Sequence, residues 1–219
     1  METGIDTNKT GTLTVGYFYG TDSDTEKNTP ISGVYFRLYR IAAVSANGVY
    51  TLESGFAESG ITDEQLNNLA HAKDTTAVIE ALVNFLEKVQ TEQTGQTEQT
   101  EETKPEQTEA EQTEPVQRRT AVSAEYQQAK AVTDKSGVAR FENLEVGLYL
   151  LTADEWIQDE LIYSSNPSLV SIPAADDGGN GWEYDVEVNV KAEAVTASQD
   201  NDAPSDDPTD DPTADPTDD

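Results

Sequence analysis

Two low-complexity tracts limit how much of this 219-residue chain can fold around a hydrophobic core. The first, residues 90–117, holds eight glutamates, and the tripeptide Glu-Gln-Thr recurs in it. The second, residues 192–219, holds nine aspartates and a proline at every fourth position from 204 to 216. Neither tract has enough apolar surface to offset the entropy of ordering the chain, so we expect a disordered loop and a disordered spacer. The remaining residues suffice for one domain.

The charge and the lack of cysteine exclude several classes of function. The formal net charge is -30, from 13 basic and 43 acidic residues, and more than half of it lies in the two tracts. No basic stripe could neutralise phosphates, so we expect no binding to nucleic acid or to an anionic membrane. Without cysteine there are no disulfides and no thiol catalysis, and we expect neither a cofactor nor a metal. No apolar run has the length of a membrane span or a signal-peptide core, so an exported protein would be represented here by a mature portion.

Alternating apolar residues indicate an all-β fold. Leu13, Val15 and Tyr17 alternate with small or polar residues, and residues 34–38 repeat the pattern. Four more short apolar segments bounded by turn residues follow, at 138–141, 148–152, 169–172 and 184–190. Many short strands with such punctuation predict an Ig-like β-sandwich.

A helical insertion is expected at residues 62–89. Thr62 and Gln65 have the spacing of a capping box, and Asp74 could be the N-cap of a second helix. The second helix has an apolar stripe, formed by Val78, Ile79, Leu82, Val83, Leu86 and Val89. We expect the stripe to pack on the domain's own sheet, and a face for a partner is the alternative.

These boundaries predict a simple domain organisation. Residues 1–10 would be an N-terminal extension and residues 11–191 the sandwich domain, with the insertion at 62–89 and the acidic loop at 90–117. Residues 192–219 would be the extended spacer.

The last predicted strand ends on a lysine. Tyr184, Val186, Val188 and Val190 fall on one face of this strand, so Lys191 points to the other face, toward solvent. From the pattern alone, Lys191 is either a solvated residue at a strand end or the site of a reaction.

Residues 169–191 resemble the end of the N-terminal domain of Gram-positive, sortase-assembled major pilins. In that family the pilin motif reads W-x-x-x-V-x-V-x-P-K. Residues of this chain match it at the same spacing: Trp182, Val186, Val188 and Lys191. Val190 stands where the family has proline. Residues 133–151 are similar to the family's turn, strand and G-x-Y signature, and residues 30–40 to its second strand.

The resemblance implies a Cna-B-type sandwich that is a structural subunit, not an enzyme. In the family, a pilus sortase holds the sorting-signal threonine of one subunit as a thioester. The pilin-motif lysine of another subunit attacks it, which leaves an isopeptide bond between the chains. Lys191 would be this acyl acceptor, the partners would be the pilus sortase and other pilin subunits, and the location would be the cell surface or cell wall.

The family also forms isopeptide bonds within domains, but this chain lacks the residues for one. The first predicted strand reads Val-Gly-Tyr-Phe-Tyr at 15–19, where a lysine would be required. Ala153 replaces the assisting acid, Asn189 is near the acceptor position, and Lys9 precedes the strand. We therefore predict no internal isopeptide bond.

Two other classes of function stay open on the sequence. A surface adhesin or accessory pilin could bind a host or matrix ligand through aromatic residues, which are Tyr17, Phe18, Tyr19, Tyr35 and Tyr39. A hydrolase could use the adjacent carboxylates Asp154 and Glu155, although nothing in the sequence separates their pKa values. A Ser-His-Asp triad would have to use the single histidine, His71, which we expect to be a solvated helix residue.

Overall fold

The computed structural model describes residues 4–20, 28–69, 72–94, 126, 129–158, 160–176, 178 and 181–196. Most of the acidic loop and most of the spacer predicted from composition lie outside the described residues, and so does His71. Within the described part, the predicted β-sandwich with a helical insertion is confirmed.

Two sheets pack face to face to form the sandwich. The six-stranded sheet has the order β2-β1-β13-β9-β8, and β6 pairs with β1. Its strands are β1 (Thr10–Tyr19), β2 (Thr29–Pro30), β6 (Val138–Glu145), β8 (Trp156–Gln158), β9 (Leu161–Ser164) and β13 (Asp185–Thr196). The first and last long strands, β1 and β13, run parallel, whereas the other pairs in this sheet are antiparallel.

The second sheet has five strands in the order β10-β7-β3-β4, with β5 paired to β3. Its strands are β3 (Tyr35–Val44), β4 (Tyr50–Leu52), β5 (Ala129–Val132), β7 (Gly147–Ala153) and β10 (Ser168–Ile172). A separate two-stranded ribbon consists of β11 (Ala174–Ala175) and β12 (Trp182–Glu183).

The alternation read from the sequence decides which side chains enter the core between the sheets. From β1, Leu13, Val15 and Tyr17 are fully buried there. From β3, Phe36 and Leu38 meet them, and the Tyr17 and Phe36 rings contact edge to face with centroids 5.3 Å apart. Burial of these apolar and aromatic side chains supplies the main stabilisation of the sandwich.

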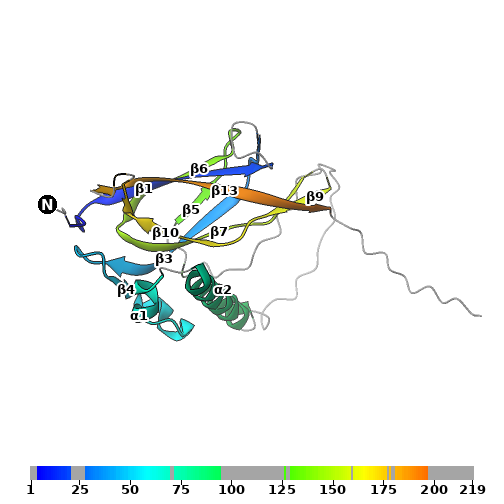
Figure 1. Cartoon of the computed structure of the whole chain (residues 1–219). Helices are drawn as coiled ribbons and strands as arrows, with labels where there is room; N and C mark the ends of the chain where they lie inside the picture. The colour runs from blue at the N-terminus through cyan, green and yellow to red at the C-terminus, as the bar shows by residue number, and fades with distance from the viewer. Residues whose placement is uncertain are drawn as a thin grey trace, which may run out of the picture.

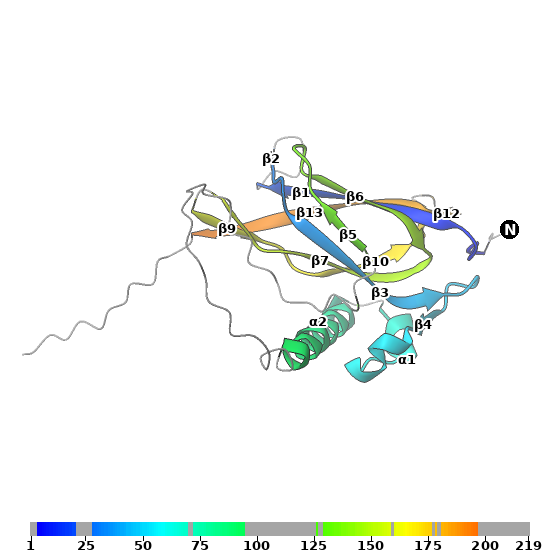
Figure 2. The ribbon, with the colours of Figure 1, turned by 180° about the vertical axis from the view of Figure 1, so that it is seen from behind.

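The helical insertion forms a third layer. It consists of the 3-10 helix η2 (Ser54–Ser59), α1 (Asp63–Asn67) and α2 (Ala72–Thr94). Figures 1 and 2 show α1 and α2 on the side of β3, β4 and β7, away from β1 and β13. Tyr39 and Leu150 of that sheet are fully buried in a cluster with Leu82 and Leu86 of α2. The prediction that the stripe packs on the domain's own sheet is thus confirmed. None of the described helices is long and apolar enough to cross a membrane.

The ends of the helices differ in part from the prediction. Thr62 caps α1 as predicted, but α2 begins at Ala72, so the expectation that Asp74 is an N-cap is wrong. Asp74 lies in the first turn instead, where a carboxylate interacts favourably with the helix dipole. The helix also continues to Thr94, into the tract that we expected to be disordered from residue 90.

The folded part extends beyond both predicted boundaries of the sandwich. Before β1, Ile5 is buried against Val44 and Val146, and its amide donates to the Ala46 carbonyl at 2.9 Å. After residue 191, β13 continues to Thr196 in antiparallel pairing with β9. Ala192 and Ala194 alternate with exposed Glu193 and Val195, so the inward face of the strand stays apolar within the acidic tract. Composition averaged over the whole tract hides this short alternation.

Replacing Thr62 with alanine should destabilise the domain by about 1 kcal/mol. The Thr62 hydroxyl accepts from the Gln65 amide at 3.3 Å, and the Gln65 side chain accepts from the Thr62 amide at 2.9 Å. Urea unfolding monitored by circular dichroism would measure the loss. Thr62→Ser, which keeps the hydroxyl, should stay within a few tenths of a kcal/mol of the parent. Equal losses for both variants would contradict a capping role.

Candidate functional site

Strand β13 holds Lys191 at a place where its neighbour in the sheet changes. Residues up to Ala192 pair with β1, and the Cα partner of Lys191 is Phe18. From Glu193 onward the strand pairs with β9, beginning at Ser164. We expected Lys191 at the end of the folded domain. It lies instead within β13, and the strand is paired with a neighbour both before and after this residue.

The side chain of Lys191 is exposed and its amine is uncommitted. Lys191 is exposed between half-buried Val190 and buried Ala192, as the alternation along the strand predicts. The Lys191 amine makes neither a hydrogen bond nor an ion pair with a described residue, although Glu193 shares its face. By contrast, the Lys9 amine lies 4.7 Å from the centroid of the Tyr184 ring, and the Lys130 amine lies 3.6 Å from that of Tyr35.

The other residues of the lysine motif serve the fold. Val186 is buried in the core between the sheets, and Val188 packs against it. Trp182 belongs to the β11–β12 ribbon, where it pairs with Ala175 and is 38% exposed. Nine residues of extended chain span about 30 Å, so Trp182 and Lys191 do not form one contiguous surface. Only Lys191 presents reactive chemistry.

Val190 fits the strand in which it replaces the proline of the resembling motif. The Thr12 amide donates to the Tyr184 carbonyl at 2.8 Å, so the backbone groups of Tyr184 and of every second residue after it face β1. Val190 is one of these residues, and its amide is a donor toward β1 that proline lacks. The side chain of Val190 packs against the core.

Asn189 lies outside the core. It is exposed on β13 opposite Gly16, and its side-chain oxygen occupies the space that a Cβ on Gly16 would need. Val15 pairs with Val188 in the neighbouring core position, and Lys9 lies outside the sandwich core. The absence of an internal isopeptide bond stays a prediction.

Comparisons with known proteins returned structures but no sequence families. No protein-family model and no curated protein matches the chain. The structure is similar to the full-length major pilin SpaD from Corynebacterium diphtheriae, with a TM-score of 0.44, 18% identity, 86% of this chain covered and 31% of that chain. For the Corynebacterium diphtheriae major pilin SpaA, the TM-score is 0.40 and the identity 21%, and the match covers 84% of this chain and 30% of that chain.

A third match is the solution structure of the SpaA pilin–signal peptide complex from the same organism. It has a TM-score of 0.42 and 20% identity, and the match covers 86% of this chain and 100% of that chain. The chain thus spans less than a third of the length of the SpaD and SpaA major pilin structures named above. At these identities and TM-scores, any function has to be argued from the residues of the chain itself.

The aromatic residues considered for ligand binding do not form a common surface. Tyr17 and Tyr39 are fully buried, in two different clusters. Tyr35 lies under the Lys130 amine, and Tyr19, which is 40% exposed, packs edge to face on Tyr163 with centroids 5.5 Å apart. This arrangement does not favour an aromatic adhesive site.

The surroundings of Asp154 do not suit the hydrolase alternative. A catalytic carboxylate has to be accessible to a substrate, but Asp154 is only 2% exposed. Both of its oxygens accept from the Arg37 guanidinium, one of them at 2.8 Å, so the carboxylate is committed to a buried salt bridge. Glu155 is half-buried, and its neighbour Asp154 is not a free carboxylate that could form a catalytic pair with it.

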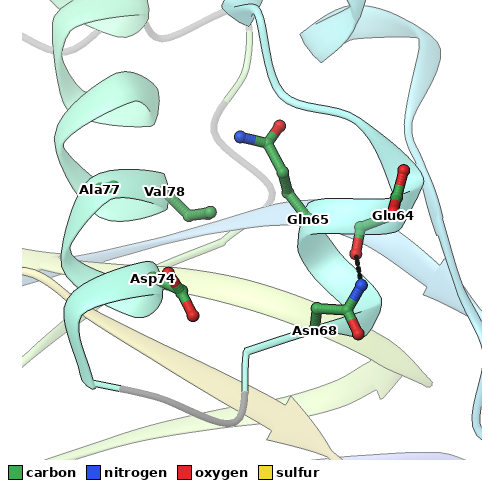
Figure 3. A pocket seen from close by; sticks show the side chains of 6 residues that line it. All are labelled: Glu64, Gln65, Asn68, Asp74, Ala77 and Val78. Carbon is green, nitrogen blue, oxygen red and sulfur yellow. Dashed lines mark hydrogen bonds between the residues drawn. The ribbon is translucent and has the colours of Figure 1, made fainter.

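A pocket between α1 and α2 is lined by acidic and amide side chains. Its volume is about 290 Å³, and Figure 3 shows Glu64, Gln65 and Asn68 at its α1 side and Asp74 and Val78 of α2 across from them. The Asn68 amide donates to the Glu64 carbonyl at 2.9 Å. No group of three or more histidine or acidic residues suited to a metal occurs among the described residues.

Proposed function

We propose that this domain is a structural subunit of a covalently polymerised cell-surface pilus, and that the Lys191 amine is the acyl acceptor for the bond between subunits. The observation that carries the proposal is the state of Lys191: an exposed, uncommitted amine within a rigid strand, at the lysine position of a pilin motif. In this role the protein is the substrate of a pilus sortase, and its further partners are other pilin subunits.

The chemistry is an acyl transfer. The enzyme holds the threonine carbonyl of a donor subunit as a thioester on its cysteine. The neutral Lys191 amine attacks this carbon, a C–N bond forms, the C–S bond breaks, and the amine proton that is lost goes to the departing sulfur or to a base of the enzyme. Because the amine makes no hydrogen bond or ion pair among the described residues, none has to be broken before it enters the enzyme.

Rigidity of the strand favours the same reaction. A nucleophile reacts efficiently when it is held within about 3–3.5 Å of the carbon that it attacks. The pairing of β13 with β1 and then with β9 fixes the backbone on either side of Lys191, so only the four-carbon stem has to be ordered.

Replacing Lys191 with alanine should abolish coupling to a donor peptide of the LPXTG type by a pilus sortase. Mass spectrometry of the product would measure coupling and locate the modified residue. Matched controls are Lys135→Ala in the β5–β6 turn and Lys73→Ala at the start of α2, since both lysines are exposed and, within the described part of the chain, unpaired. Both controls should couple as the parent does. Undiminished coupling of Lys191→Ala would refute the assignment.

A further inference from the structure

Apolar side chains surround Lys191 on the outer face of the six-stranded sheet, which is the face turned away from the core. In the row of Lys191, its neighbour on β1 is Phe18, and the next neighbour on β2 is Pro30. In the preceding row, Val138 lies beside Gly16. The Phe18 ring leans over the Cα of Gly16, because two of its carbons are the nearest side-chain contacts there after the Asn189 oxygen.

A second apolar row lies on the other side of Lys191, beyond the polar pair of Glu193 and Ser164. Val195, four residues further along β13, pairs with Ile162 of β9, which in turn pairs with Ile157 of β8. Directly opposite residues share a face of the sheet, and Val195 shares the face of Lys191 because strand side chains alternate with period two. Val195 is 59% exposed.

These six residues are not part of any core cluster. We call them the Lys191 patch: Phe18, Pro30, Val138, Ile157, Ile162 and Val195. Pro30 and Val195 are exposed and the other four are half-buried. Both helices lie on the opposite side of the domain (Figure 2), so neither helix covers this face.

The rest of this face of the sheet is polar. One row along from Gly16, Thr14 pairs with Arg140 and Glu187. In the row beyond Thr14, the Thr12 hydroxyl donates to the Asp185 carboxylate at 2.5 Å. Apolar side chains on this face therefore lie on both sides of the one lysine that its described strands present. A partly exposed apolar patch with a polar rim is typical of a protein interaction site.

We propose that the Lys191 patch is the surface on which the acyl-transfer enzyme itself docks, through an apolar area with basic side chains at its edge. This inference rests on the proposed function of Lys191. The enzyme must bring its acyl carbon to within about 3–3.5 Å of the amine, so its body must cover the residues beside Lys191. A typical interface of about 800 Å² on each partner corresponds to a disc of about 16 Å radius.

The patch lies within that radius. Phe18 is one strand away from Lys191, about 5 Å, and Val195 is four residues away along the strand, about 13 Å. Glu187 and Glu193 are exposed on the same face and would meet the basic edge of the enzyme. Charge of this kind mainly raises the association rate and fixes the orientation, whereas the apolar anchors supply affinity.

The test is the affinity of the full chain for a pilus sortase whose catalytic cysteine is replaced by alanine, measured without a donor peptide. The double variant Phe18→Ala, Val195→Ser should bind at least about tenfold more weakly than the parent. The double control Val49→Ser, Val132→Ser removes exposed apolar side chains elsewhere and should bind as the parent does. Thermal unfolding checks that both fold, and Glu187→Lys, Glu193→Lys provides a second, purely surface variant that should also weaken binding.

Equal affinity of the parent and both patch variants would overturn the proposal. So would a loss of affinity that appears only when the donor peptide is added, because the patch would then contact the peptide and not the enzyme. Lys191→Ala separates this inference from the proposed function: it should abolish coupling but keep binding to the inactive enzyme within about threefold, since most of the contact is made by hot-spot side chains other than the lysine. Full coupling of Lys191→Ala would refute the proposed function, whatever the patch variants show.

Discussion

Replacing Asp154 with alanine is expected to destabilise the domain by about 3–5 kcal/mol. The carboxylate is 2% exposed and accepts from two nitrogens of Arg37, which is itself 8% exposed. Without Asp154, the guanidinium stays charged and buried but has lost its carboxylate partner, and this loss costs far more than the salt bridge contributes when intact. A loss of this size is a large share of the 5–15 kcal/mol that typically stabilises a domain.

Urea unfolding and thermal unfolding of the parent and the variant would measure the effect, with a fall in Tm of about 10 °C. The matched control is Glu142→Ala, which breaks the exposed pair between Arg140 and Glu142, 3.0 Å apart, and should cost less than about 1 kcal/mol. Adding Arg37→Leu to a variant with Asp154→Leu should recover much of the loss, because an apolar pair needs no partner charge. A cost below about 1 kcal/mol for Asp154→Ala would show that the pair is solvated.

The salt bridge also shows where sequence alternation gave an incomplete account. Alternation along β3 places Phe36 and Leu38 in the core, and they are buried there. The same rule puts Arg37 and Tyr39 on a solvent face, yet both are buried. The five-stranded sheet is covered on both sides, by the other sheet and by α2, so its strands have no fully solvated face. Period two alone does not reveal a second covering layer.

The candidate site has a similar division between what was predictable and what was not. The motif spacing and the alternation along one strand sufficed to single out Lys191 and its direction. The Lys191 patch was not predictable, since its six residues come from six strands, and three of these, β2, β8 and β9, are too short to give a periodic signal. Its members become neighbours only through the parallel pairing of β1 with β13 and the sheet order, which are tertiary features.

The free energy of unfolding of the domain should fall steeply between pH 10 and pH 12. Burial raises the pKa of Tyr17 to about 12 and that of Tyr39 to about 12, against an ordinary value of 10.0. Burial also raises the pKa of Tyr149, against the opposing effect of Arg40. Neither the Tyr17 nor the Tyr39 hydroxyl has a hydrogen-bond partner among the described residues, although Ser165 and Thr152 lie close enough to moderate the two pKa values.

The direction follows from which state holds the proton. Between pH 10 and pH 12 the unfolded chain ionises its tyrosines while the folded chain keeps them neutral. The contribution of each buried tyrosine is therefore fully present below pH 10 and is lost as the pH rises toward 12. At pH 11, one unit above the ordinary pKa, the loss is up to about 1.4 kcal/mol for each of Tyr17 and Tyr39, or about 2.7 kcal/mol together.

The double variant Tyr17→Phe, Tyr39→Phe isolates this effect, because both states of the parent and of the variant otherwise carry the same titrating groups. At pH 8 the variant should be as stable as the parent or slightly more so, since no hydrogen bond to a described residue is lost. At pH 11 it should be more stable by about 2.7 kcal/mol in urea unfolding. Tyr149→Phe is unsuitable for this comparison, because the Tyr149 hydroxyl donates to the Glu145 carbonyl. A stability difference between parent and double variant that does not change from pH 8 to pH 11 would mean that the two hydroxyls reach solvent.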